Sequence, residues 1–120
     1  MPDPLILGFD TSAAHCAAAV VSGDRILAAR YEPMATGQAE RLMVMLQDLL
    51  AEAGTTWAGL AAIGVGIGPG NFTGVRISVA AARGLALALK VPAIGVSTLE
   101  AMAFGAEGPA IVQLDARRGQ

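Results

Sequence analysis

Residues 5–32 read LILGFDTSAAHCAAAVVSGDRILAARYE, and this stretch decides the fold. It contains three apolar runs separated by two short polar segments. Apolar runs of this length, bounded by turn residues, predict β-strands at Leu5–Asp10, residues 16–21 and residues 25–32. The second polar segment contains Gly23, which can adopt the positive φ that a tight hairpin requires. We therefore expect the chain to begin with an antiparallel meander of three strands.

Beyond residue 37 the pattern changes to an alternation of helices and strands. Apolar residues recur at helical spacing, and Gly54 ends the first such run. The predicted helices are Gln38–Ala53, Phe72–Leu89 and a short one at residues 99–104. The predicted strands are short apolar runs at residues 62–67, Ala93–Val96 and Ile111–Leu114. Strand–helix–strand connections make the connected strands parallel.

Together these elements predict an α/β domain. We expect a mixed five-stranded sheet, made of the three-strand antiparallel meander plus parallel crossovers, with helices on its faces. This is the arrangement of the ribonuclease-H-like fold and of one lobe of the actin-like ATPases. No helix follows the run at Ile111–Leu114. We therefore assign residues 1–109 to this lobe and residues 110–120 to the start of a second, truncated lobe.

The composition excludes several classes of protein. Of the 120 residues, 54% are hydrophobic and 15% are charged, and the net charge is −2. Such a chain is too apolar to be disordered, and its charge gives no basis for independent nucleic-acid binding. The longest uncharged stretch, residues 53–75, is interrupted by glycines and Pro69, which argues against a membrane span. One cysteine and one histidine make neither a disulfide nor a zinc cluster. We expect a cytoplasmic protein without a metal or cofactor.

The two long predicted helices carry more apolar surface than one core requires. On the first, Met43, Val44 and Met45 widen the stripe made by the leucines. On the second, small residues at helical spacing allow another helix to approach closely, and Arg76 lies beside them. We predict a partner interface formed by Leu42, Met45, Leu46, Leu49, Arg76, Ile77, Ala80, Ala81, Gly84 and Ala88.

Two loops have features of ligand sites, and both have a simpler structural interpretation. Alternating glycines lead into the second long helix through Gly68, Pro69, Gly70, Asn71, Phe72, Thr73 and Gly74. The start of a helix can bind an anion, but this loop matches neither a Walker A motif nor a dinucleotide fingerprint. We interpret it as a tight structural turn. Asp10, Thr11 and Ser12 end the first strand, where a nucleotide-binding lobe would hold phosphate. We favour a local turn there too.

The carboxylates and the cysteine do not complete a catalytic site. A nuclease of this fold needs several converging carboxylates. Asp10 and Glu40 could supply two, but the segment Gly68-Pro69-Gly70 offers no third. His15 and Cys16 are neighbours in a strand, so they point to opposite faces and cannot act as a base and nucleophile. We predict no catalytic residues.

Four segments of the sequence resemble the TsaB (YeaZ) family of bacterial tRNA threonylcarbamoyladenosine biosynthesis. They are residues 7–12 (LGFDTS), 68–77 (GPGNFTGVRI), 93–101 (AIGVSTLEA) and 114–117 (LDAR). The second segment is the most specific, and Asn71 stands there where the family commonly has serine. Either residue can cap a helix. Members of the family continue into a second lobe.

The resemblance implies a non-catalytic member of the actin-like ATPase superfamily. The related transferase TsaD has a His-X-X-X-His metal motif, and Thr98 and Met102 stand at the matching positions here. Neither side chain can replace an imidazole ligand.

The resemblance also implies partners. In the family, TsaB binds TsaD through its first two helices, the ATPase TsaE joins the pair, and the same face allows a homodimer. The implied function is a scaffold that meets tRNA only through the complex, with Asp10, Thr11 and Ser12 as a vestigial phosphate site. The alternatives are a metal-dependent glycoprotease-like enzyme and a stand-alone nucleotide-binding module.

Overall fold

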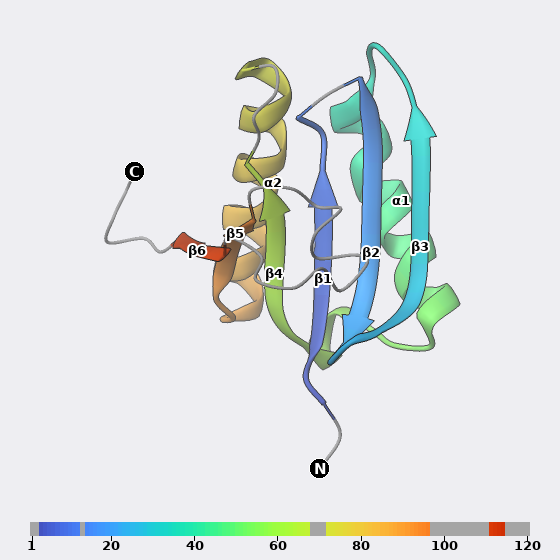
Figure 1. Cartoon of the computed structure of the whole chain (residues 1–120), viewed down its shortest axis with the longest axis vertical. Helices are drawn as coiled ribbons and strands as arrows, with labels where there is room; N and C mark the ends of the chain where they lie inside the picture. Colours follow the sequence, from blue (N-terminus) through green and yellow to red (C-terminus); the bar gives the residue numbers. More distant parts are fainter. Residues whose placement is uncertain (1–2, 13, 68–71, 97–110, 115–120) are drawn as a thin grey trace.

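A computed structural model describes residues 3–12, 14–67, 72–96 and 111–114 of the chain. Within these residues, six strands form one sheet in the order β3-β2-β1-β4-β5-β6 (Figure 1). The strands are β1 (Leu5–Asp10), β2 (His15–Ser22), β3 (Arg25–Pro33), β4 (Leu60–Gly66), β5 (Ala93–Val96) and β6 (Ile111–Leu114). The helices are α1 (Gln38–Ala53), the short 3-10 helix η1 (Trp57–Gly59) and α2 (Phe72–Leu89).

The strand directions confirm the predicted mixed sheet. β1, β2 and β3 form an antiparallel meander, whereas β4 is parallel to both β1 and β5. The sheet has six strands in the described residues rather than the predicted five, because β6 pairs antiparallel with β5. The division into two lobes at residue 110 stays a prediction. The helix expected at residues 99–104 lies outside the described residues.

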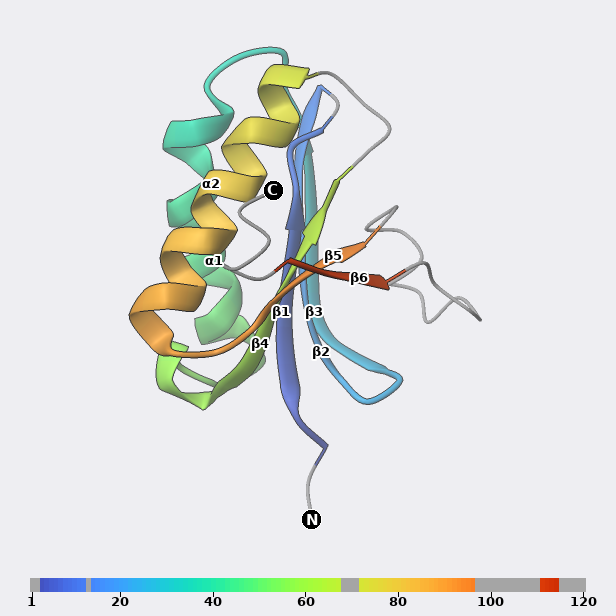
Figure 2. The ribbon, with the colours of Figure 1, turned by 90° about the vertical axis from the view of Figure 1, so that its left-hand side faces the viewer.

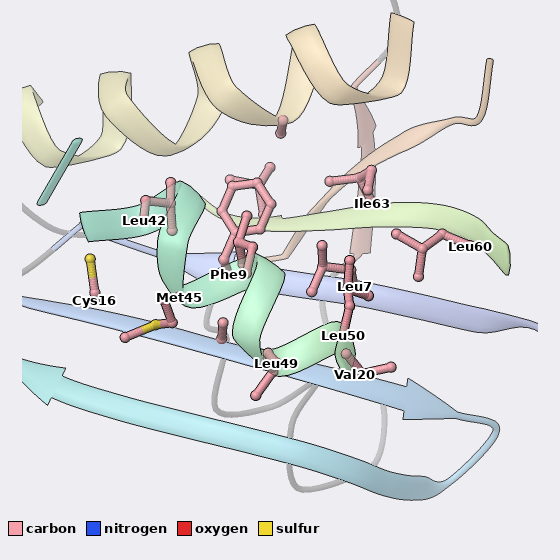
Figure 3. Close-up of a cluster of buried hydrophobic side chains, with 14 of the residues drawn as sticks. Leu7, Phe9, Cys16, Val20, Leu42, Met45, Leu49, Leu50, Leu60 and Ile63 are labelled. Atoms are coloured by element: carbon pink, nitrogen blue, oxygen red, sulfur yellow. The ribbon is translucent and has the colours of Figure 1, made fainter. Parts of the chain in front are cut away.

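Both α1 and α2 cover the same face of the sheet (Figure 2). Alternate residues of β1, such as Leu7 and Phe9, point into this layer and are fully buried. The core cluster between sheet and helices includes Leu7, Phe9, Cys16, Ala18, Val20, Leu42, Met45, Leu46, Leu49, Leu50, Leu60, Ile63, Val65 and Ala82 (Figure 3). Among the described residues, no helix has both the length and the apolar character needed to cross a membrane.

Two arginines fasten α1 to the edge strand β3. Arg41 of α1 donates two hydrogen bonds to the carboxylate of Glu32, at 2.7 and 2.6 Å. Arg30 of β3 donates to Glu52 of α1 at 2.6 Å. A planar guanidinium fixes the orientation of a carboxylate through such paired bonds. These contacts hold α1 against β3, the outermost strand of the meander.

Candidate functional site

A groove of about 500 Å³ lies between α1 and α2. Its walls are small and apolar side chains, with one arginine. α1 contributes Ala39, Leu42 and Met43, and α2 contributes Thr73, Arg76, Ile77, Ala80 and Ala81. Five of the predicted interface residues, namely Leu42, Arg76, Ile77, Ala80 and Ala81, therefore line one continuous hollow. Such a hollow can accept a ridge of side chains from another helix.

The structure corrects the prediction for α1. Leu42, Met45, Leu46 and Leu49 are at most 1% exposed, because the chain's own sheet covers them. The strongest helical repeat in this segment is therefore the stripe that faces the core. The apolar residues that α1 presents outward are Met43 and Val44, which are 38% and 48% exposed. A partner could contact Met43 and Val44. Of the four interface residues predicted on α1, only Leu42 lines the groove and could be reached by a partner.

On α2 the predicted residues lie on the outward side. Arg76, Ala80, Gly84 and Ala88 are exposed, and Ile77 and Ala81 are half-buried beside the groove. Within the described residues, a Cβ at position 84 would have no atom of another element within 4 Å, so no contact with another element there requires glycine. Leu87, which the sequence interpretation missed, is 81% exposed. Its spacing of three from Gly84 and seven from Ala80 places it on the same side of the helix and could have identified it.

Thr11 is fully buried, and its polar atoms contact the first two turns of α2 and the first residue of α1. Its hydroxyl donates to the carbonyl of Gly74 at 2.6 Å, and its N–H donates to the hydroxyl of Ser78 at 2.7 Å. Its carbonyl accepts a hydrogen bond from the Gln38 side chain at 3.4 Å. The hydroxyl that would contact a phosphate in a nucleotide-binding lobe is thus occupied by α2 here.

Asp10 and Ser12 form a local turn at the same end of β1. The N–H of Ser12 donates to Asp10 Oδ1 at 2.6 Å, a common arrangement for aspartate in turns. The Asp10 carboxylate lies against Gly66 of β4, where a Cβ would come within 2.6 Å of Asp10 Cγ. On its other side, His15 Nε2 lies 3.9 Å from Asp10 Oδ2. Position 66 therefore needs glycine, because β4 comes so close to the Asp10 side chain.

The structure describes few of the remaining residues that were predicted to have a functional or structural role. Of the predicted strand–helix turn, residues 68–71 lie outside the described part of the chain, and Phe72, Thr73 and Gly74 form the first turn of α2. Thr98 and Met102 also lie outside the described residues. In the part that the structure describes, no three His, Cys, Asp or Glu side chains come together to hold a metal ion.

Three titratable groups on β2, β3 and α1 have shifted pKa values, and the hydrogen bond to Glu32 raises the pKa of Arg41. The hydrogen bond from Arg41 lowers the pKa of Glu32 below its ordinary value. Burial, assisted by the nearby charge of Glu32, raises the pKa of the Cys16 thiol. A buried thiol of raised pKa is a poor nucleophile. Cys16 therefore acts as a packed core residue.

Comparison with known proteins identifies relatives of this fold. The family model of TsaD, the tRNA N6-adenosine threonylcarbamoyltransferase, matches residues 32–120. The Escherichia coli K12 protein TsaB, a tRNA threonylcarbamoyladenosine biosynthesis protein, is 39% identical across 96% of this chain and 52% of its own length.

Two solved structures are also similar. YeaZ from Pseudomonas aeruginosa is 42% identical with a TM-score of 0.73, across 78% of this chain and 44% of that one. A protein described as similar to peptidase YeaZ from Pseudomonas aeruginosa is 40% identical with a TM-score of 0.76, across 88% and 50%.

The chain spans about half the length of the curated relatives it matches. The match to the family model covers most of the chain, and the two structural neighbours share its α/β, actin-like arrangement. The chain therefore belongs to the TsaD family, in which it resembles the TsaB (YeaZ) proteins.

Proposed function

We propose that the chain is a non-catalytic scaffold in bacterial tRNA threonylcarbamoyladenosine synthesis. It binds and activates the transferase TsaD by packing α1 and α2 against it. TsaE joins this pair, and tRNA is contacted only through the complex. In the absence of TsaD the same surface pairs two copies of the chain. All of this takes place in the cytoplasm.

The groove between α1 and α2 is the observation that carries the proposal. Apolar side chains exposed beside small residues form an interface core that another helix can fill. Met43, Val44 and Leu87 are large and exposed, and Ala80 and Gly84 on α2 are small and exposed. The match of the chain to the TsaD family model supports a partner of related fold, because related folds can pair through equivalent helices.

The polar contacts of the first loop support a scaffold rather than an enzyme. Thr11 directs its hydroxyl to α2, and Asp10 accepts a hydrogen bond from the neighbouring Ser12. These bonds stabilise the turn and compete with any phosphate for the same groups. They favour the scaffold over a glycoprotease-like enzyme or a stand-alone nucleotide-binding module.

Co-purification with TsaD from the same organism tests the interface. Ala80→Asp places a carboxylate in the groove, where a bound partner would remove its water, and burial of a charged group is costly. We expect this variant to lose TsaD while keeping its fold. Ala29→Asp is the matched control, because Ala29 is exposed on β3 and pairs with Ala19, which packs with Ile6 and Val21 apart from the helix-facing core. Wild-type recovery of TsaD by Ala80→Asp would refute this surface.

A reconstituted reaction tests the absence of catalysis. Asp10→Asn keeps the oxygen that accepts from Ser12 but removes the charge that a catalytic or metal-binding role would need. With TsaD and TsaE present, we expect this variant to support formation of the modified nucleoside at the wild-type rate. Loss of product from an intact complex would contradict the scaffold assignment.

A further inference from the structure

A single buried residue at the end of β1 joins the starts of the two helices that form the groove. Thr11 contacts α2 through Gly74 and Ser78, and it contacts α1 through Gln38. Thr11, Ser78 and Gln38 are 0%, 0% and 8% exposed. In Figure 1 this junction lies at the upper end of the sheet, where β1 ends and both α1 and α2 begin. The bonded residues are 27 to 67 positions apart in the sequence, so no local sequence pattern predicts this arrangement.

The hydroxyl groups of Thr11 and Ser78 are hydrogen-bonded to each other at this junction. A threonine hydroxyl has a single proton, and Thr11 gives it to the carbonyl of Gly74. With that proton used, the hydroxyl of Ser78, which lies 2.5 Å from Thr11 Oγ1, can donate to that oxygen. The same Ser78 oxygen accepts the N–H of Thr11. The result is a closed ring of bonds that fixes α2 relative to β1.

Thr11 is connected to α1 through its backbone carbonyl group. Gln38, the first residue of α1, donates from Nε2 to the carbonyls of Thr11 and His15 at 3.4 and 3.2 Å. Its neighbour Ala39 lines the groove on the α1 side. Thr73, the neighbour of Gly74, lines it on the α2 side. The spacing between these two walls is therefore set where Thr11 holds both helices.

We infer that Thr11 is a positioning residue for the partner interface. It fixes the separation of α1 and α2 and so keeps the groove at the width that the partner requires. A surface that is already in its bound geometry binds more tightly, because less conformational freedom is lost on association. The inference rests on the proposed binding of TsaD at this groove. It adds a buried residue, Thr11, that affects the affinity without touching the partner.

The test compares affinity with stability in a small set of variants. Thr11→Val keeps the shape and removes the hydroxyl, whereas Thr11→Ser keeps the hydroxyl. Ser78→Ala removes the other half of the ring. Leu60→Ala is the control, because Leu60 is buried at the start of β4, the end of the strand away from Asp10. Each variant is titrated calorimetrically into TsaD at a temperature where circular dichroism shows it folded, and its urea unfolding is measured separately.

We expect Thr11→Val and Ser78→Ala to bind TsaD about five- to tenfold more weakly, because the loosened helices would have to be ordered again on association. Thr11→Ser should stay within about twofold of wild type. Leu60→Ala should lose stability without losing affinity.

A Thr11→Val variant that loses stability but keeps wild-type affinity would overturn the inference and leave Thr11 a purely structural residue. If that variant does not fold, Ser78→Ala decides by the same criterion. Failure of the proposed function has a different signature, since wild type would then not bind TsaD, or Ala80→Asp would bind normally.

Discussion

Substitution of Gly84 should separate the stability of the chain from its ability to bind a partner. Gly84 is exposed within α2, and in the described part of the chain a Cβ there would meet no atom of another element within 4 Å. Glycine in a helix interior costs about 0.5–1 kcal/mol relative to alanine. Gly84→Ala should therefore raise the free energy of unfolding by about that amount. Gly84→Leu should raise it as well, because leucine is also a strong helix former.

The same leucine should weaken the complex with TsaD. Forcing extra methylene groups into a packed interface costs about 1–3 kcal/mol, which corresponds to a roughly 5- to 150-fold loss of affinity. Urea unfolding measures the first effect and calorimetric titration the second. Ala29→Leu adds similar bulk at an exposed position of β3 and should leave the affinity unchanged. A Gly84→Leu chain that binds with wild-type affinity, or that is less stable than wild type, would refute this reasoning.

Three further results are expected from urea unfolding and thiol labelling. Leu46→Ala should lower the free energy of unfolding by about 2–5 kcal/mol. Met43→Ala should barely change the free energy of unfolding but should weaken TsaD binding. Equal losses of stability in the two variants would contradict the burial of Leu46 and the exposure of Met43. Arg41 lowers the pKa of Glu32 in the folded state, so this pair should stabilise the fold at pH values above the ordinary glutamate pKa of 4.5. That contribution should be lost as the pH falls through the lower pKa of the folded state. Glu32→Gln should remove this part of the pH dependence of unfolding, and an unchanged acid profile would argue against the pair. Burial raises the pKa of Cys16, so iodoacetamide should react slowly with the native chain and rapidly in urea; equal rates would show that the thiol is accessible.

Local sequence patterns predicted most of the backbone. α1, α2, β1 and β5 begin and end at the predicted residues, because apolar periodicity and flanking turn residues are local signals. β4 begins at Leu60 rather than at residue 62, since Leu60 pairs with Leu5 across a register shift that only the assembled sheet reveals. The place of β6 in the sheet likewise depends on pairing with a distant strand.

The candidate site was less predictable, because it depends on which side of each helix the sheet covers. The leucine repeat of α1 gave a correct helix but placed Leu46 on the partner surface, whereas it belongs to the core. On α2 the small residues Ala80 and Gly84 do lie outward, since the larger Leu85 and Leu89 occupy the core side. The role of Thr11 depends on bonds across 63 and 67 residues, which no spacing rule contains.

The heat capacity of association with TsaD tests the central claim most directly. Burial of apolar surface gives a negative heat-capacity change, the most dependable thermodynamic mark of such an interface. Calorimetric titration of the wild-type chain into TsaD over a range of temperatures should show saturable one-to-one binding whose enthalpy becomes more favourable on warming. No binding, or binding whose enthalpy is independent of temperature, would contradict an interface built by packing α1 and α2 against the transferase.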